Sequence, residues 1–143
     1  MRLLLDTNVV SELGKSNGNA AVQATIRAVD EDDLFVSVLT LGEIRQGMER
    51  LPPGDKRRRL VAWLAELRGS FATRLLPVDA AVAETWGVLN ARLRSAGRLV
   101  PTVDGLLAAT ALTHGLVMAT RNVRDFEPTG IDLLDPWNDP PPG

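Results

Sequence analysis

Short apolar segments that alternate with longer helical segments restrict the fold of this 143-residue chain more than any other feature. Runs rich in Leu and Val and bounded by turn residues are typical of buried strands. The predicted strands are residues 3–5, 34–38, 74–78, 116–119 and 131–134. Strands that alternate with helices favour a parallel sheet covered on both faces. We therefore predict an α/β fold with three layers, α/β/α, around a central, mostly parallel five-stranded sheet.

The intervening segments carry apolar residues at helical spacing, and most follow a residue whose side-chain oxygen can cap a helix. The residues expected at these helix starts are Thr7 or Asn8, Asn19, Thr40, Asp55, Asp79 and Thr102. Residues 135–143 contain four prolines and are predicted to form an extended tail. Because the chain has no internal repeat and no linker, we expect residues 1–143 to form a single domain.

Four acidic residues fall at predicted strand or helix ends that face the same side of the sheet. Asp6 follows the first strand, and Asp125 lies in the loop after the fourth. Glu43 and Asp104 lie in the first turns of helices that begin at the same edge. In open α/β sheets, ligands bind beyond the carboxyl ends of the strands. The sequence therefore predicts that four carboxylates meet at one edge of the sheet.

Each of these acids also has an ordinary structural explanation. Asp6 is a common turn residue after a strand, and Glu43 would complete a capping box with Thr40. Asp104 would complement the positive end of a helix, and Asp125 would cap a short turn. Taken singly, structural and chemical roles are about equally supported. Grouping four carboxylates costs stability unless a cation compensates them, so their shared location favours a chemical role.

A metal ion is the cation that this composition allows at such a cluster. The chain has no cysteine and one histidine, His114, so an intrinsic metal site must be built from oxygen atoms. Oxygen ligands favour magnesium or manganese. Two such ions about 3.5–4 Å apart could activate a water and stabilise the leaving oxygen of a phosphodiester. The residues that would support the cluster or contact the substrate are Thr7, Asn8, Thr120 and Asn122.

The charge pattern gives weaker information about partners. The net charge is −2, and Lys15 and Lys56 are the only lysines among 16 basic residues. Arginine pairs well with phosphate, but a general preference for arginine explains this bias equally well. The basic run at residues 56–59 is more typical of a solvated helix face than of a phosphate site. The leucine run that ends at Asp6 is too short for a signal peptide, and no segment could span a membrane, so we expect the protein in the cytoplasm.

Four segments of the chain resemble the motifs of one known family. These segments are Leu5–Glu12, Ser37–Gly47, Asp104–Ala111 and Thr120–Phe126. At these positions the chain resembles the PIN-domain ribonucleases, and in particular the VapC-type toxins of toxin–antitoxin pairs. The similarity extends over nearly the whole chain and includes all four acidic residues.

The resemblance implies a function as well as a fold. It implies a PIN-like parallel sheet, a magnesium or manganese site, cleavage of single-stranded RNA, and a homodimer. It also implies a small antitoxin that inserts into the active-site groove and that itself contacts operator DNA. By this resemblance, Asp6, Glu43, Asp104 and Asp125 are the catalytic and metal-binding residues. We therefore predict the metal-dependent endoribonuclease of a type II toxin–antitoxin module, with an RNA target that the sequence does not define.

A homodimer is also predicted from the helices themselves. Residues 20–29, 39–51 and 55–68 carry apolar stripes that exceed what one small sheet should cover.

Two alternative functions remain open from the residues alone. A phosphatase of the haloacid-dehalogenase type would use an aspartate after the first strand, but it needs a second aspartate where this chain has Asn8. A non-catalytic α/β interaction domain would leave the fourth acid unexplained. Release of phosphate from small esters would identify the phosphatase, and absence of any turnover would identify the interaction domain.

Overall fold

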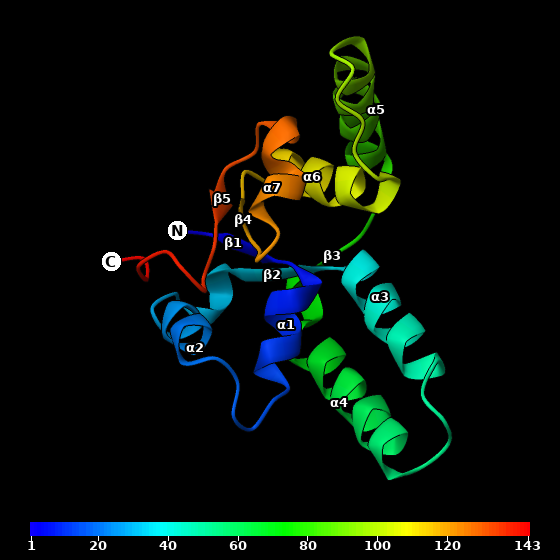
Figure 1. Cartoon of the computed structure of the whole chain (residues 1–143), viewed down its shortest axis with the longest axis vertical. Helices are drawn as coiled ribbons and strands as arrows, with labels where there is room; N and C mark the ends of the chain where they lie inside the picture. Colours follow the sequence, from blue (N-terminus) through cyan, green and yellow to red (C-terminus); the bar gives the residue numbers. More distant parts are fainter.

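A five-stranded sheet lies between two layers of helices in the computed structural model, which describes residues 1–143 (Figure 1). The strands are β1 (Leu3–Leu5), β2 (Leu34–Ser37), β3 (Leu75–Leu76), β4 (Val117–Ala119) and β5 (Leu133–Leu134). Their order across the sheet is β3-β2-β1-β4-β5, and every neighbouring pair is parallel. The predicted three-layer α/β fold is confirmed, and the sheet is entirely parallel.

The helices divide into two groups that cover opposite faces of the sheet (Figure 1). One face is covered by α1 (Thr7–Leu13), α2 (Ala20–Arg27), α3 (Val38–Glu49) and α4 (Asp55–Phe71). The other face is covered by α5 (Ala80–Ser95), α6 (Thr102–His114) and α7 (Val123–Phe126). Short 3-10 helices precede three strands, namely η1 (Glu31–Asp33), η2 (Ala72–Arg74) and η3 (Glu127–Thr129). None of the helices combines the length and the apolar character that a membrane span requires.

Each face of the sheet has its own hydrophobic core. Leu3 and Leu5 point into the layer of α1 to α4, whereas Leu4 points into the layer of α5 to α7. This division follows from the alternation of side chains along a strand. Because β1 is buried on both faces, its sequence is a continuous apolar run instead of an alternating one.

The apolar stripes of α2, α3 and α4 are largely used within the chain. Val22, Ile44, Met48 and Leu67 are all buried in the first core. The stripes therefore do not exceed what the sheet covers, and they provide no argument for a homodimer. The large apolar side chains that remain exposed lie mostly elsewhere: Met1, Val61, Val78, Val88, Leu99, Val103 and Leu112.

Two helix starts near the carboxyl edge differ from the prediction. Asp6 itself is the N-cap of α1, which begins at Thr7. Helix α3 begins at Val38, because the Ser37 hydroxyl accepts a hydrogen bond from the Leu39 amide at 3.0 Å. Thr40 is a buried residue inside this helix. The predicted capping box of Thr40 and Glu43 is therefore wrong.

The other helix starts agree more closely with the prediction. Asn19 and Asp79 cap α2 and α5 through their side chains, as predicted. Asp55 and Thr102 are the first helical residues of α4 and α6, one position later than a cap.

The tail begins with a compact turn and not with an extended segment. The Asp135 carboxylate accepts hydrogen bonds from the Trp137 amide at 2.9 Å and from the Asn138 side chain at 2.7 Å. Asp139 in turn accepts one from the Asp135 amide. The short polar side chain of Asp135 thus holds a local turn that the proline content alone did not predict.

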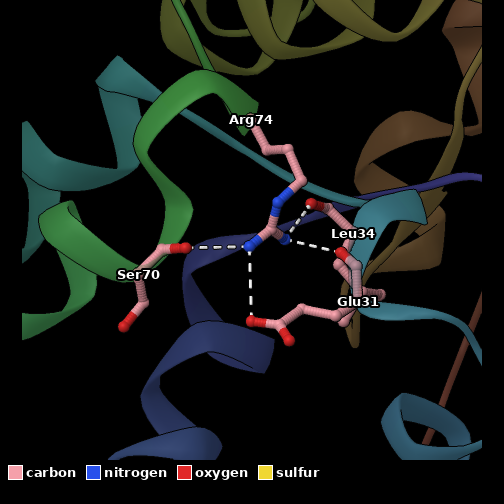
Figure 2. A network of polar contacts seen from close by, with 4 residues as sticks. All are labelled: Glu31, Leu34, Ser70 and Arg74. Atoms are coloured by element: carbon pink, nitrogen blue, oxygen red, sulfur yellow. Dashed lines mark hydrogen bonds and ion pairs between the residues drawn. The ribbon is translucent and has the colours of Figure 1, made fainter.

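Arg74 joins the end of α4 to the start of β2 (Figure 2). Its Nη1 donates to the carbonyl oxygens of Glu31 and Leu34, at 2.6 and 2.8 Å. Its Nη2 donates to the Ser70 carbonyl at 2.8 Å, near the C-terminal end of α4, where a positive charge is favourable. The guanidinium therefore satisfies three carbonyl groups that no other side chain contacts.

We expect Arg74→Met to destabilise the protein by about 2–3 kcal/mol, because charged hydrogen bonds to partly buried carbonyls are lost. Urea unfolding would measure the change. Arg68→Met is the matched control, since Arg68 lies on an exposed part of α4 and forms no ion pair. Equal stability of the two variants would show that the Arg74 hydrogen bonds contribute little.

Candidate active site at the carboxyl end of the sheet

Asp6 lies where the strand order of the sheet reverses, between β1 and β4. Leu5 pairs with Ala119, and the Asp6 amide donates to the Ala119 carbonyl at 2.9 Å. The residues that follow these two strands, Asp6 and Thr120, are therefore direct neighbours. This crevice is the expected ligand site of an open parallel sheet.

The Asp6 carboxylate is buried and held by three donors. The Thr7 amide donates to Oδ1 at 2.8 Å, the Thr120 hydroxyl to Oδ2 at 2.7 Å, and the Asn8 side-chain amide to Oδ2 at 3.3 Å. Only 6% of the residue is exposed. Hydrogen bonds to a buried carboxylate favour its charged form, so they offset the cost of burial.

Glu43 reaches the same edge from α3. Its Oε1 accepts a hydrogen bond of 2.7 Å from the Thr7 hydroxyl, and the Thr40 hydroxyl lies 3.3 Å from that of Thr7. Glu43 is exposed and makes no hydrogen bond with the start of its own helix. Its position is thus explained by the strand that precedes Thr7 and not by helix capping.

Asp104 provides direct information on how the four acids are arranged. It lies half-buried in the first turn of α6, and its carboxylate accepts no hydrogen bond within the chain. Burial, followed by the charges of Asp6, Asp125 and Glu43, raises the pKa of Asp104 from 3.8 to about 6. The structure therefore brings all four predicted carboxylates into one electrostatic cluster, with Asp125 exposed on α7.

The raised pKa of Asp104 implies that the metal-free protein loses stability as pH rises. The folded state holds this proton up to about pH 6, whereas the unfolded state releases it near pH 3.8. The stabilising contribution of the bound proton is complete below pH 3.8 and is lost as pH rises through about 6.

We expect Asp104→Asn to melt at the same temperature as the unmodified protein near pH 4 and above it at pH 7. Because Asp104 is half exposed, screening limits the gain to about 1 kcal/mol, or roughly 3 °C. Thermal melts in chelator across pH 4–7 would measure it. A difference in melting temperature that stays constant with pH would contradict the clustering of charges.

The polar residues of the site form a network around Asp6. The Thr120 hydroxyl accepts from the Asn122 amide at 3.0 Å, and the Asn8 side-chain oxygen accepts from the Arg121 amide at 3.2 Å. Thr7, Asn8 and Thr120 thus contact the acidic cluster through their side chains. Asn122 contributes its backbone amide, and its side chain forms no hydrogen bond to the acids.

The donor set fits a hard divalent cation. All four acids supply oxygen atoms, and none of them forms an ion pair with Lys or Arg. As the side chains stand, no three of them converge closely enough to hold one ion. Asp6 is fixed by its donors, but Glu43 and Asp125 are exposed and can change rotamer on binding. Residues Asp6, Glu43, Asp104 and Asp125 would hold magnesium or manganese here.

His114 and Ser37 differ in how they relate to the site. His114 lies at the C-terminal end of α6, whereas Asp104 lies at the N-terminal end, so the histidine is remote from the acids. Ser37 and Thr40 were not predicted as site residues, yet Ser37 sets the start of α3 and thereby places Glu43. The sequence offered two hydroxyl residues three positions apart as possible caps, and it did not distinguish them.

Comparison with known proteins gives a consistent family assignment. The profile of the PIN domain family matches residues 3–130. The VapC ribonuclease Y4jK of Sinorhizobium fredii is 37% identical over 136 residues, which cover 94% of this chain and 97% of that protein.

Solved structures extend the similarity to three dimensions. The crystal structure of FitAcB from Neisseria gonorrhoeae matches with a TM-score of 0.88 and 33% identity, covering 96% of this chain and 99% of that one. The structure of FitAB bound to an IR36 DNA fragment matches with a TM-score of 0.88 and 31% identity, covering 96% of each chain.

Proposed function

This chain belongs to the PIN-domain family and is a VapC-type toxin by similarity, and we propose that it is a divalent-metal-dependent endoribonuclease. It would act, as one domain of residues 1–143, as the toxin of a type II toxin–antitoxin module. The observation that carries the metal dependence is the raised pKa of Asp104, which reflects three further carboxylates with no compensating cation. The family match favours neither the phosphatase nor the non-catalytic interaction domain.

The residues of the chain would divide the work among them. Asp6, Glu43, Asp104 and Asp125 would hold magnesium or manganese, which lowers the pKa of a bound water and neutralises charge that develops on a phosphodiester. Thr120, Asn8 and the Thr7 amide keep the Asp6 carboxylate ionised and fixed in direction. The Thr7 hydroxyl orients Glu43. Hydrolysis of the P–O bond gives one terminal phosphate and one hydroxyl.

The proposed partners follow from the relatives. FitAB is bound to a DNA fragment in one structure that resembles this chain. We infer that this toxin likewise pairs with a small antitoxin and contacts operator DNA only through it. A homodimer is proposed from the family resemblance alone. Because RNA is the substrate, the proposed location is the cytoplasm.

Removal and return of metal tests the activity. We expect excess EDTA to abolish cleavage of a single-stranded RNA oligonucleotide, and we expect magnesium or manganese to restore it. The same ions should raise the melting temperature of the protein, because they bind only the folded state. Asp104→Asn should lose both effects. Full cleavage in chelator would contradict the metal mechanism, and phosphate release from p-nitrophenyl phosphate without RNA cleavage would favour the phosphatase.

A further inference from the structure

The acidic cluster lies between two hollows of different chemistry. The first has a volume of about 430 Å³ and lies between α1, α3 and α4, with Thr7 and Glu43 in its lining. The second, of about 510 Å³, lies beside α7, with Asn122 and Asp125 in its lining. Since α1, α3 and α4 cover one face of the sheet and α7 the other, the hollows flank the edge that carries Asp6 (Figure 1).

The first hollow, called here the apolar groove, suits an unpaired nucleotide. Its apolar wall consists of Ile44, Met48, Leu60 and Trp63. Its lining also includes Lys15 and Lys56, the only two lysines of the chain. An indole ring offers a flat surface on which a base can stack, and ammonium groups beside it match the adjoining phosphates.

The ring of Trp63 is held in place by the close approach of α1. A Cβ atom added to Gly14 would lie only 2.7 Å from the ring, so the glycine allows the indole to pack directly against the backbone. Lys56, which the sequence placed in a solvated basic run, instead lines this groove and forms no ion pair. Lys15 is paired only with Glu12 on its own helix turn, at 3.0 Å.

The second hollow, called here the arginine pocket, suits phosphate. Arg121 and Arg124 line it and form no ion pairs. The Arg121 guanidinium lies 5.2 Å from the centroid of the Trp137 ring, which supports it as a cation–π pair. Its backbone amide donates to Asn8, whose side chain also contacts Asp6. The position of Arg121 is therefore tied to the acidic cluster.

We propose that one RNA strand crosses the acidic edge from the apolar groove to the arginine pocket, an inference that rests on the proposed ribonuclease activity. An unpaired base on one side of the cleaved bond stacks on Trp63, while Lys15 and Lys56 bind its phosphates. On the other side, Arg121 and Arg124 bind a further phosphate. This arrangement explains how a chain with a net charge of −2 holds a polyanion over four carboxylates. It also requires single-stranded substrate, because a paired base cannot offer its face to the indole.

The cations are tested by two double variants, Lys15→Gln with Lys56→Gln, and Arg121→Gln with Arg124→Gln. We expect each to raise the KM for a single-stranded RNA oligonucleotide by about tenfold with little change in kcat. The dependence of KM on salt should also weaken, by roughly 0.7 in logarithmic slope for each phosphate that the variant no longer binds. The stabilisation by magnesium should be unchanged, which separates substrate binding from metal binding.

Arg94→Gln with Arg98→Gln is the matched control for charge. These residues lie in the last turn of α5 and in the loop after it, at the end of that helix that points away from the sheet (Figure 1). We expect this variant to keep the KM and the salt dependence of the unmodified protein. If the lysine or the arginine variant matches this control, the proposed path is wrong, and an unchanged lysine variant would leave the groove to a protein partner.

The stacked base is tested by changing the RNA instead of the protein. We expect one abasic position, next to the cleaved bond, to lower kcat/KM by about tenfold or more in the unmodified protein. The same position should have little effect in Trp63→Leu. The abasic series in the unmodified protein remains decisive if Trp63→Leu does not fold. If no abasic position has an effect, the base-stacking role is overturned, whereas absence of any RNA cleavage would instead overturn the proposed function.

Discussion

Glu43→Gln should lower RNA cleavage by about two orders of magnitude or more, because a neutral amide loses the charge that holds a hard cation. The melting temperature without metal should stay nearly unchanged. The Thr7 hydroxyl can donate to the Gln oxygen as it does to Glu43 Oε1, at 2.7 Å. No cap is removed, since α3 begins at Val38 and its cap is Ser37.

Cleavage rates and melting curves on the same preparation would measure both effects. Glu66→Gln is a suitable control, since Glu66 is exposed on α4 and forms no ion pair. Growth arrest on expression in cells should also disappear in Glu43→Gln and persist in the control. A Glu43→Gln variant that keeps its nuclease activity would remove this residue from the site.

The architecture was predictable because burial on both faces leaves a clear trace in the sequence. Continuous runs such as Leu3–Leu5 identify strands of a parallel sheet, and helical spacing fills the gaps between them. The exact helix starts were less accessible. Ser37 and Thr40 both carry a hydroxyl, and only the backbone conformation decides which one faces the end of α3.

The composition of the site was predictable to a similar extent, but its hydrogen bonds were not. Acids at strand and helix ends identify a carboxylate cluster, whereas the hydrogen bond from Thr120 to Asp6 joins residues 114 positions apart. That hydrogen bond depends on the pairing of Leu5 with Ala119, which no local pattern contains. Likewise, the run at residues 56–59 reads as a solvated face, and only the packing of α4 against α1 shows that Lys56 lines a groove.

Asp6→Asn should behave differently from Glu43→Gln, because it should lose stability as well as activity. Asp6 accepts hydrogen bonds from three donors, and both of its oxygen atoms are used. If the new amide group replaces Oδ2, it faces the Asn8 amide and the Thr120 hydroxyl. If it replaces Oδ1, it faces the Thr7 amide. In either orientation a donor meets a donor in a buried place, which costs about 1–3 kcal/mol.

The contrast with Asp104→Asn makes this expectation sharp. Asp104 accepts no hydrogen bond and has a raised pKa, so its neutralisation relieves repulsion, whereas neutralisation of Asp6 breaks a satisfied network. Without metal at pH 7, Asp6→Asn should therefore unfold at lower urea concentration than the unmodified protein, and Asp104→Asn at higher. Both should lose RNA cleavage. If both variants gained stability, the three donors around Asp6 would not be satisfied by its charge, and the acidic cluster would be held together by the fold alone.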